Sequence, residues 1–163
     1  MADDPAEVRG DDPADIRAWQ RLSDRITTSG RLRDHDPARL GAIRVRHVIN
    51  LAMPDHPEAL PDTEAAFAAQ GIGYTHIPVP FDAPSEAHYR AFAEALKKAD
   101  GPVHVHCIAN WRVSAFFYRY HRACGMPEAE ARTLLERQWS PEDSAHPDAP
   151  TWAAFIQADE RER

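Results

Sequence analysis

The stretch VHVHCIANWRVSAFFYRYH, residues 103–121, places a cysteine between two regular elements. Residues 103–107 form an apolar run after Gly101-Pro102, which predicts a buried strand that ends at the cysteine. Residues 112–123 predict a helix, and Gly125 is the residue type favoured just past a helix end. The sequence therefore predicts a loop of only four residues between Cys107 and Arg112, at a strand-to-helix junction.

Strands and helices alternate before this junction, and further helices follow it. The predicted strands are Ile26-Thr27, His47–Leu51 and Tyr74–Val79, and the predicted helices are 15–23, a helix from Asp36, 62–70, 85–98, 128–138 and a last helix near Thr151. Such alternation predicts an α/β fold with a central, mainly parallel sheet and helices on both of its faces. We expect a single domain over residues 15–163 and a disordered segment over residues 1–14.

Composition narrows the classes of function. The net charge is -7, which argues against a surface that follows the phosphates of a nucleic acid. No apolar run approaches the roughly 18 residues of a membrane span, and the acidic start has no signal-peptide pattern. We therefore expect a cytoplasmic protein with no membrane partner, in which Cys107 and Cys124 are not joined by a disulfide. The oligomeric state does not follow from the sequence.

The residues around Cys107 are typical of a site that stabilises a cysteine thiolate and binds an anion. A cysteine reacts as its thiolate, and loop amides together with a helix N-terminus favour negative charge. Arg112 would add a planar guanidinium that matches two phosphate oxygens, and the hydroxyl of Ser114 could donate to the sulfur or to a leaving group. The alternative is that Cys107 is one more buried thiol at a strand end. Cys124 lies near a predicted helix end without such neighbours, so we expect it to have no chemical role.

Two aspartates are candidates for an acid at the same sheet edge. Asp82 follows the 74–79 strand, and Asp55 follows the 47–51 strand. Each aspartate could also be a turn residue. His104 and His106 alternate on one strand and so share a face, but the sequence offers them no supporting ligand cluster, so we expect no metal site. The helix residue Arg119 is predicted to be solvated.

The residues His106-Cys107, the short loop and Arg112 together resemble the phosphate-binding loop of the protein tyrosine and dual-specificity phosphatase superfamily. The chain is also similar to bacterial members of this superfamily over residues 25–156. The segments that carry this wider likeness are TTSGRLRDHDPARLGAIRVRHVINLAMPDHPE (27–58), YTHIPVPFDAPSEAHYRAFAEAL (74–96) and QWSPEDSAHPDAPTWAAFI (138–156).

This resemblance implies a dual-specificity-phosphatase-like fold and hydrolysis of a phosphomonoester through a phosphocysteine. It implies that Cys107 attacks phosphorus, Asp82 protonates the leaving oxygen and His106 orients the loop and keeps the cysteine ionised. The residues that would bind phosphate are Ile108, Ala109, Asn110, Trp111, Arg112 and Ser114. No cofactor is implied, and the partner would be a phosphorylated protein or a small phosphomonoester.

The loop departs from the usual pattern of the superfamily. Most members have five residues between the cysteine and the arginine, with a serine or threonine directly after the arginine. This chain has four residues, then Arg112, Val113 and Ser114, as some bacterial relatives of this subgroup also have. Without the usual loop glycines, Asn110 is the residue best able to adopt a left-handed backbone. Trp111 is either a pocket wall or a core residue.

Two other functions remain open. A Cys-to-Arg loop of this shorter length also occurs in rhodanese-like sulfurtransferases, where it holds a persulfide sulfur. That reading explains the loop length but gives no role to Asp82. A non-catalytic phosphate-binding module, with the loop kept and turnover lost, is the other alternative.

Overall fold

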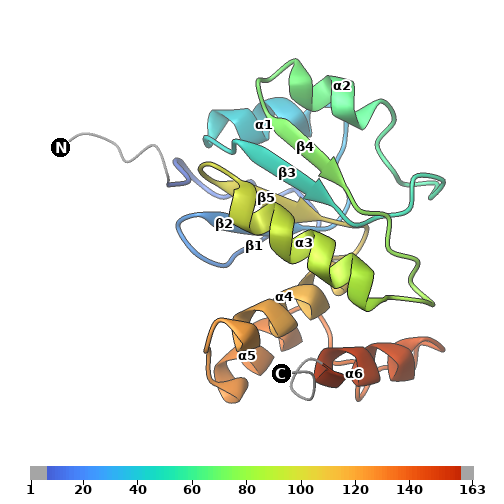
Figure 1. Ribbon diagram of the computed structural model, residues 1–163. Coiled ribbons are helices and arrows are strands. Elements are labelled where there is room, and N and C mark those ends of the chain that lie inside the picture. Colours follow the sequence, from blue (N-terminus) through green and yellow to red (C-terminus); the bar gives the residue numbers. More distant parts are fainter. Residues whose placement is uncertain (1–6, 159–163) are drawn as a thin grey trace.

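The computed structural model describes residues 7–158, which fold around one five-stranded sheet (Figure 1). The strands are β1 (Gln20–Arg21), β2 (Ile26–Ser29), β3 (His47–Asn50), β4 (Gly73–His76) and β5 (Val103–His106). The helices are α1 (Asp36–Ala42), α2 (Thr63–Ala68), α3 (Glu86–Lys98), α4 (Trp111–Ala123), α5 (Glu128–Glu136) and α6 (Ala149–Ala158). The predicted α/β class with a mainly parallel sheet is confirmed.

The strand order β1-β2-β5-β3-β4 places β5 at the centre. Only β1 runs antiparallel, against β2, while the other neighbours are parallel. His106 at the end of β5 lies in register with Ser29 of β2 and Asn50 of β3. The carboxyl ends of these strands therefore share one edge, and the loop after β5 meets the loops that follow β2 and β3 there.

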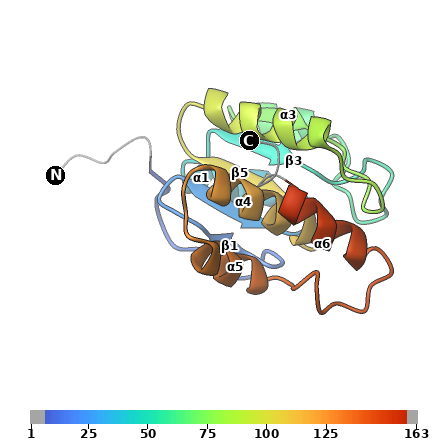
Figure 2. The same ribbon diagram turned by 60° about the horizontal axis from the view of Figure 1, so that its bottom comes forward.

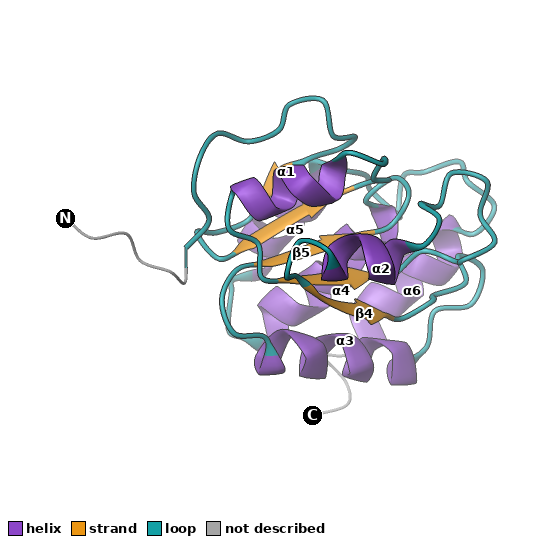
Figure 3. Ribbon diagram, turned by 90° about the horizontal axis from the view of Figure 1, so that it is seen from above, coloured by secondary structure: helices purple, strands orange, loops and turns teal. Residues whose placement is uncertain are grey.

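Helices cover both faces of the sheet. Figures 1 and 3 show α1 and α2 on one face and α3 on the other, and Figure 2 shows α4, α5 and α6 packed together on the α3 side. Neighbouring residues of β3 point to opposite faces, since Val48 joins the cluster of Leu40 and Phe67 while Ile49 joins the larger cluster that contains Phe92. Both faces are therefore buried, as a parallel sheet requires.

The helix predicted over residues 15–23 is wrong. Ala18 has a φ of 53°, a left-handed value that interrupts a right-handed helix, and residues 20–21 form β1 instead. The packed chain also starts before residue 15, because Val8 is buried and its amide donates to the carbonyl of Asp24. The remaining parts of the expected disordered segment and of the expected domain, residues 1–6 and 159–163, lie outside the described residues.

Arg119 is fully buried, so its predicted exposure on α4 is wrong. Its guanidinium makes two hydrogen bonds to the Glu86 carboxylate, at 2.5 and 3.0 Å, and lies 4.3 Å from the ring centre of Tyr89. A buried arginine needs such a partner, because an unpaired charge away from water is costly. The pair joins α4 to the start of α3, where the Ser85 hydroxyl accepts the His88 amide in the predicted N-cap.

Within residues 7–158, none of the helices combines the length and the apolar character that crossing a bilayer requires.

Candidate active site

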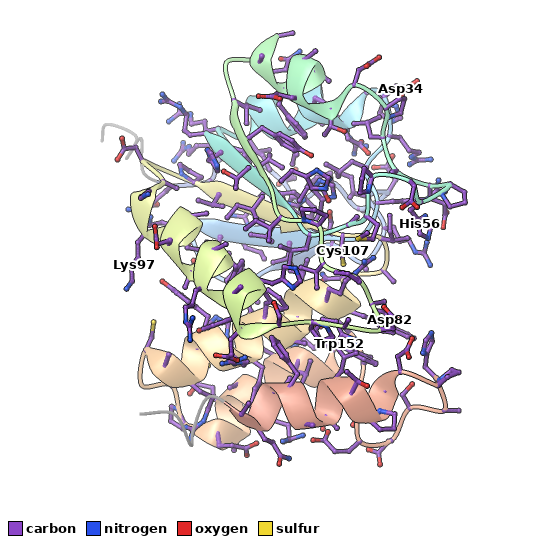
Figure 4. All side chains as sticks on the ribbon, turned by 45° about the vertical axis from the view of Figure 1, so that its right-hand side comes forward. Asp34, His56, Asp82, Lys97, Cys107 and Trp152 are labelled. Atoms are coloured by element: carbon purple, nitrogen blue, oxygen red, sulfur yellow. The ribbon has the colours of Figure 1, made fainter. Side chains whose placement is uncertain are left out.

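Cys107 lies directly after β5 and is 1% exposed. Its amide donates to the carbonyl of Ser29 at 3.4 Å, which holds the start of the loop against the end of β2. Helix α4 begins four residues later at Trp111, so the loop runs from the buried strand end to a helix N-terminus. A helix N-terminus favours negative charge nearby. Figure 4 shows Cys107 between the loop that carries His56 and the loop that carries Asp82.

Asn110 takes the left-handed backbone that the sequence predicts for it. Its φ is 67° and its ψ is 8°, directly before α4. The side-chain amide donates to the carbonyl of Ala18 at 2.9 Å and to the hydroxyl of Thr28 at 3.0 Å. These two bonds tie the left-handed residue to the segment before β1 and to β2. Short polar side chains such as asparagine tolerate the left-handed conformation better than other non-glycine residues.

Gly30 gives the Cys107 loop room to pass. The carbonyl of Ile108 accepts a hydrogen bond from the amide of Arg31 at 2.9 Å. A Cβ atom on Gly30 would lie 2.4 Å from that carbonyl oxygen, which is closer than two unbonded atoms approach. The loop after β2 and the Cys107 loop therefore touch backbone to backbone.

Gly30→Ala is expected to displace the Cys107 loop and to lower the free energy of unfolding by about 1–3 kcal/mol, the usual cost of overpacking. Urea unfolding measures this loss. The matched control is Gly41→Ala in α1, where the added Cβ meets only ordinary contacts at 3.5 Å and where alanine favours a helix. Equal stability of the two variants would contradict the close contact.

Arg112 is held by the loop that follows β4. Arg112 is 7% exposed, and its Nη1 donates to the carbonyl of Val79 at 2.8 Å. The amide of Val79 in turn donates to the carbonyl of Leu51 at 3.1 Å, past the end of β3. One N–H group of Arg112 thus fixes its orientation, and arginine has four others that can bind an anion.

A cavity of about 510 Å³ opens beside the loop. The residues that line it come from four loops and the start of α4, namely Met53, Asp55, His56, Pro57, Phe81, Ala109, Trp111, Arg112 and His146. The sequence-predicted residues that it brings together are Ala109, Trp111, Arg112 and Asp55, the second of the two candidate acids. A larger hollow of about 900 Å³ lies between α3 and β4 and contains none of these residues.

Asp82 does not line this cavity. It is exposed on the turn after β4, next to Phe81. The carbonyl of Phe81 accepts a hydrogen bond from the indole of Trp152 at 2.6 Å, and the two rings lie 5.4 Å apart. These contacts anchor the turn with its phenylalanine facing the cavity and its aspartate toward solvent.

Trp111 lines the cavity and also packs against neighbouring aromatic rings, so it has both of the roles that the sequence left open. Its ring stacks parallel on Trp139 with the centres 4.6 Å apart, and the indole of Trp139 donates to the carbonyl of Trp111 at 3.1 Å. Phe81 lies 6.2 Å from the Trp111 ring. One wall of the cavity is therefore a rigid aromatic surface.

Ser114 is buried on the first turn of α4. Its hydroxyl donates to the carbonyl of Trp111 at 3.1 Å, so in this conformation it serves the helix rather than the thiol. Ile108 is also buried, and it packs with the core cluster that includes Cys107.

His104 is a buried histidine with both ring nitrogens satisfied. The hydroxyls of Thr27 and Ser29 lie 2.8 Å from its two nitrogens, and Trp19 stacks on its ring. His106 lies closer to the loop, with its Nδ1 3.4 Å from the carbonyl of Cys107. Burial lowers the pKa of His106 to about 4 and lowers the pKa of His104 well below its usual value, because both imidazolium forms would lose their hydration.

These depressed pKa values predict acid sensitivity of the fold. Below the unfolded-state pKa of about 6.5, the unfolded chain binds protons at His104 and His106 that the native state does not. The free energy of unfolding is therefore expected to fall by about 2 kcal/mol per histidine between about pH 7 and about pH 5. Urea unfolding across this range gives the free energy of unfolding at each pH. This free energy should fall less steeply with decreasing pH for His106→Asn than for the control His35→Asn, which replaces an exposed ring. Equal slopes would contradict the buried neutral His106.

Among residues 7–158, no group of three or more histidine, cysteine or acidic side chains is placed to hold a metal ion. The sequence did not single out Val79, Phe81, His56 or His146 as site residues. The sequence feature that could have pointed to them is their position, since each lies in a loop that follows a strand of the sheet or precedes α6.

Comparison with known proteins gives a family match and several similar folds. The family model for the phosphatase-like domain of beta-lactamase hydrolase-like protein matches residues 18–121. A beta-lactamase hydrolase-like protein from Agrobacterium fabrum is 32% identical over 101 residues, which is 60% of this chain and 23% of that protein. The chain therefore spans less than a quarter of the length of this relative.

Three solved structures share the fold. A DUF442 protein from Shewanella putrefaciens has 28% identity and a TM-score of 0.74 over 89% of this chain and 94% of its own. TpbA from P. aeruginosa, solved with pTyr, has 19% identity and a TM-score of 0.68 over 94% and 90% of the two chains. The catalytic core of the PP-IP phosphatase SIW14 from S. cerevisiae, solved with citrate, has 14% identity and a TM-score of 0.71 over 91% and 90%.

TpbA and SIW14 are less than 20% identical to this chain, so they show a shared fold, which is the expected dual-specificity-phosphatase-like fold. The family match covers more than half of the chain and includes β5, Cys107 and Arg112. The protein belongs to the family of the beta-lactamase hydrolase-like protein's phosphatase-like domain.

Proposed function

We propose that the protein hydrolyses phosphomonoesters through a phosphocysteine at Cys107. The observation that carries the proposal is the placement of Cys107 and Arg112 at the two ends of one loop, beside an open cavity of about 510 Å³ in whose wall Arg112 lies. The family match, to a phosphatase-like domain, supports this class of reaction.

The reaction has two steps. The Cys107 thiolate attacks phosphorus, an S–P bond forms, and the P–O bond to the leaving group breaks while a carboxylic acid gives that oxygen a proton. Water then attacks the phosphocysteine, the S–P bond breaks to release phosphate and the thiolate, and the carboxylate takes a proton from the water. Arg112 and the amides of residues 108–112 bind the phosphoryl oxygens in both steps.

We assign the acid to Asp55. Asp55 lines the cavity together with Arg112, whereas Asp82 is exposed on a turn that the bond from Trp152 to Phe81 holds in place. A general acid must reach the leaving oxygen, so its position counts first. For Asp82 to act, the turn that carries it would have to swing inward and break the Phe81 anchor.

His106 and Ser114 are positioning residues in this mechanism. The ring of His106 lies against the carbonyl of Cys107 and is neutral at physiological pH, so it orients the loop without adding charge. Ser114 secures the first turn of α4 through the carbonyl of Trp111. Both keep the loop backbone in the geometry that the anion requires.

The cavity favours an aryl phosphate as substrate, either a phosphorylated tyrosine in a protein or a small molecule. Its walls include Phe81 and Trp111, flat rings on which an aromatic leaving group can pack. Arg112 is the one arginine or lysine among the described residues that line it, so a single phosphate suits it better than a highly phosphorylated compound.

Sulfur transfer is a second candidate function, and the shortened loop favours it. With four residues between Cys107 and Arg112, the loop has one amide fewer than the usual phosphate cradle, and a smaller ring suits a single sulfur atom. The thiolate would attack the outer sulfur of thiosulfate, break the S–S bond and release sulfite, which leaves a persulfide. Cyanide would then remove the outer sulfur as thiocyanate and restore the thiolate.

One set of assays separates these functions. With p-nitrophenyl phosphate we expect turnover that vanadate inhibits competitively and that Cys107→Ser abolishes, and with thiosulfate and cyanide we expect no thiocyanate. Cysteine-dependent thiocyanate without phosphate release would overturn the proposal in favour of sulfur transfer. Phosphate that protects Cys107 from iodoacetamide, without turnover of either substrate, would identify a binding module.

A further inference from the structure

Two histidines from different loops line the cavity beside the Cys107 loop. His56 lies in the loop between β3 and α2, and His146 lies in the loop between α5 and α6. Both are partly exposed and both line the cavity that contains Arg112. The mechanism above uses neither of them.

The protein backbone fixes the tautomer of both rings. The amide of Glu58 donates to Nδ1 of His56 at 3.0 Å, and the amide of Asp148 donates to Nδ1 of His146 at 3.0 Å. A backbone amide can only donate, so each Nδ1 accepts and carries no proton. The proton of each neutral ring is therefore on Nε2, which makes Nε2–H a hydrogen-bond donor on the ring edge opposite the backbone contact.

Both rings are also held in place. His146 meets the ring of Phe81 edge-on at 4.8 Å and the ring of Trp111 at 6.1 Å. The loop of His56 is tied down through Glu58, whose carboxylate lies 3.1 Å from Arg31 and 3.5 Å from Arg17. Donors that are oriented before a ligand arrives lose little entropy when they bind it.

We propose that His56 and His146 determine specificity by donating hydrogen bonds to a carboxylate on the leaving group, while Arg112 binds the phosphate of the same molecule. A cavity of about 510 Å³ has room for both groups of a small aryl phosphate. In this arrangement the two imidazole N–H groups bind the carboxylate, and Asp55 in its protonated form donates to the ester oxygen next to phosphorus. The inference rests on the proposed phosphatase function and names the substrate class as carboxylated aryl phosphates.

Binding to Cys107→Ser tests the inference without requiring turnover. Titration calorimetry compares phenylphosphonate with its 3- and 4-carboxy derivatives, which are not hydrolysed. Hydrogen bonds to a charged group contribute about 1.5–3 kcal/mol, so we expect one carboxylated ligand to bind roughly 10-fold to 100-fold more tightly than phenylphosphonate. Adding His56→Phe and His146→Phe should remove this preference and leave phenylphosphonate binding in place.

Two further variants show whether the donors themselves matter. His56→Gln and His146→Gln retain an N–H donor and should keep more of the preference than phenylalanine does. His35→Phe, at an exposed ring before α1, should leave the ratio unchanged. Equal affinity for all three phosphonates would overturn the inference and leave the phosphatase proposal intact. No binding of any phosphonate would overturn both.

Discussion

Arg112→Lys is expected to lower kcat/KM for p-nitrophenyl phosphate by roughly 10²–10³-fold, the usual effect of removing a donor from an oxyanion site. Lysine keeps the charge but replaces the planar fork by a single ammonium, which cannot hold two phosphoryl oxygens side by side. The single nitrogen of lysine would also have to serve both the anion and the Val79 carbonyl, to which Nη1 of Arg112 donates at 2.8 Å. Steady-state kinetics measure the loss.

The matched control is Arg90→Lys, which replaces an exposed arginine on α3. This variant should retain the wild-type kcat/KM. If Arg112→Lys behaved in the same way, Arg112 would be acting as a point charge, and bidentate binding of phosphate would be excluded.

Asp55→Asn is expected to slow the first chemical step by roughly 10²–10⁴-fold on phenyl phosphate, the range for a positioned general acid. At 1.36 kcal/mol per decade this is about 3–5 kcal/mol of barrier. The loss should be much smaller on a difluorinated coumarin phosphate, because its phenol is far more acidic and its leaving oxygen needs little help. Single-turnover kinetics isolate this step from hydrolysis of the phosphocysteine.

Asp82→Asn is the control for Asp55, since both aspartates are exposed and only Asp55 lines the cavity. Asp82→Asn should leave the rates on phenyl phosphate and on the coumarin phosphate close to those of the wild type. A selective loss on phenyl phosphate at Asp82 instead would show that the turn after β4 closes over the substrate and that the acid belongs there. Equal losses on both substrates would mean that the residue shapes its loop and transfers no proton.

The fold could be predicted from the sequence where local signals agree. The apolar runs and the helix caps identify β3, β5 and α3, and their alternation predicts a parallel sheet. Strand β1 could not be predicted, because it has two residues and exists only through its pairing with β2. Arg119 was misjudged for a related reason, since its burial depends on Glu86, which lies on another helix and is 33 positions away.

The candidate site also has residues that local sequence predicts and residues that depend on tertiary contacts. One short loop and the residues at its two ends include Cys107, Arg112 and the left-handed Asn110, so these three could be predicted from the sequence. The proposed choice between Asp55 and Asp82 depends on where two separate loops point, and the sequence does not reveal the bond from α6 to Phe81 that anchors the turn of Asp82. His56 and His146 are 90 positions apart in the sequence, and they line one cavity only in the folded chain, where the sheet edge and the helices after it bring their loops to the same side.

The most direct test of phosphocysteine chemistry is to trap the intermediate. Wild-type protein is mixed with a radiolabelled aryl phosphate, quenched in acid within one turnover and digested, and the labelled peptide is identified by mass spectrometry. We expect one phosphoryl group on Cys107, and no label on Cys124 or on the Cys107→Ser variant. A burst of phenol without covalent label, or a persulfide on Cys107 after thiosulfate with no label after the phosphate ester, would contradict the proposed mechanism.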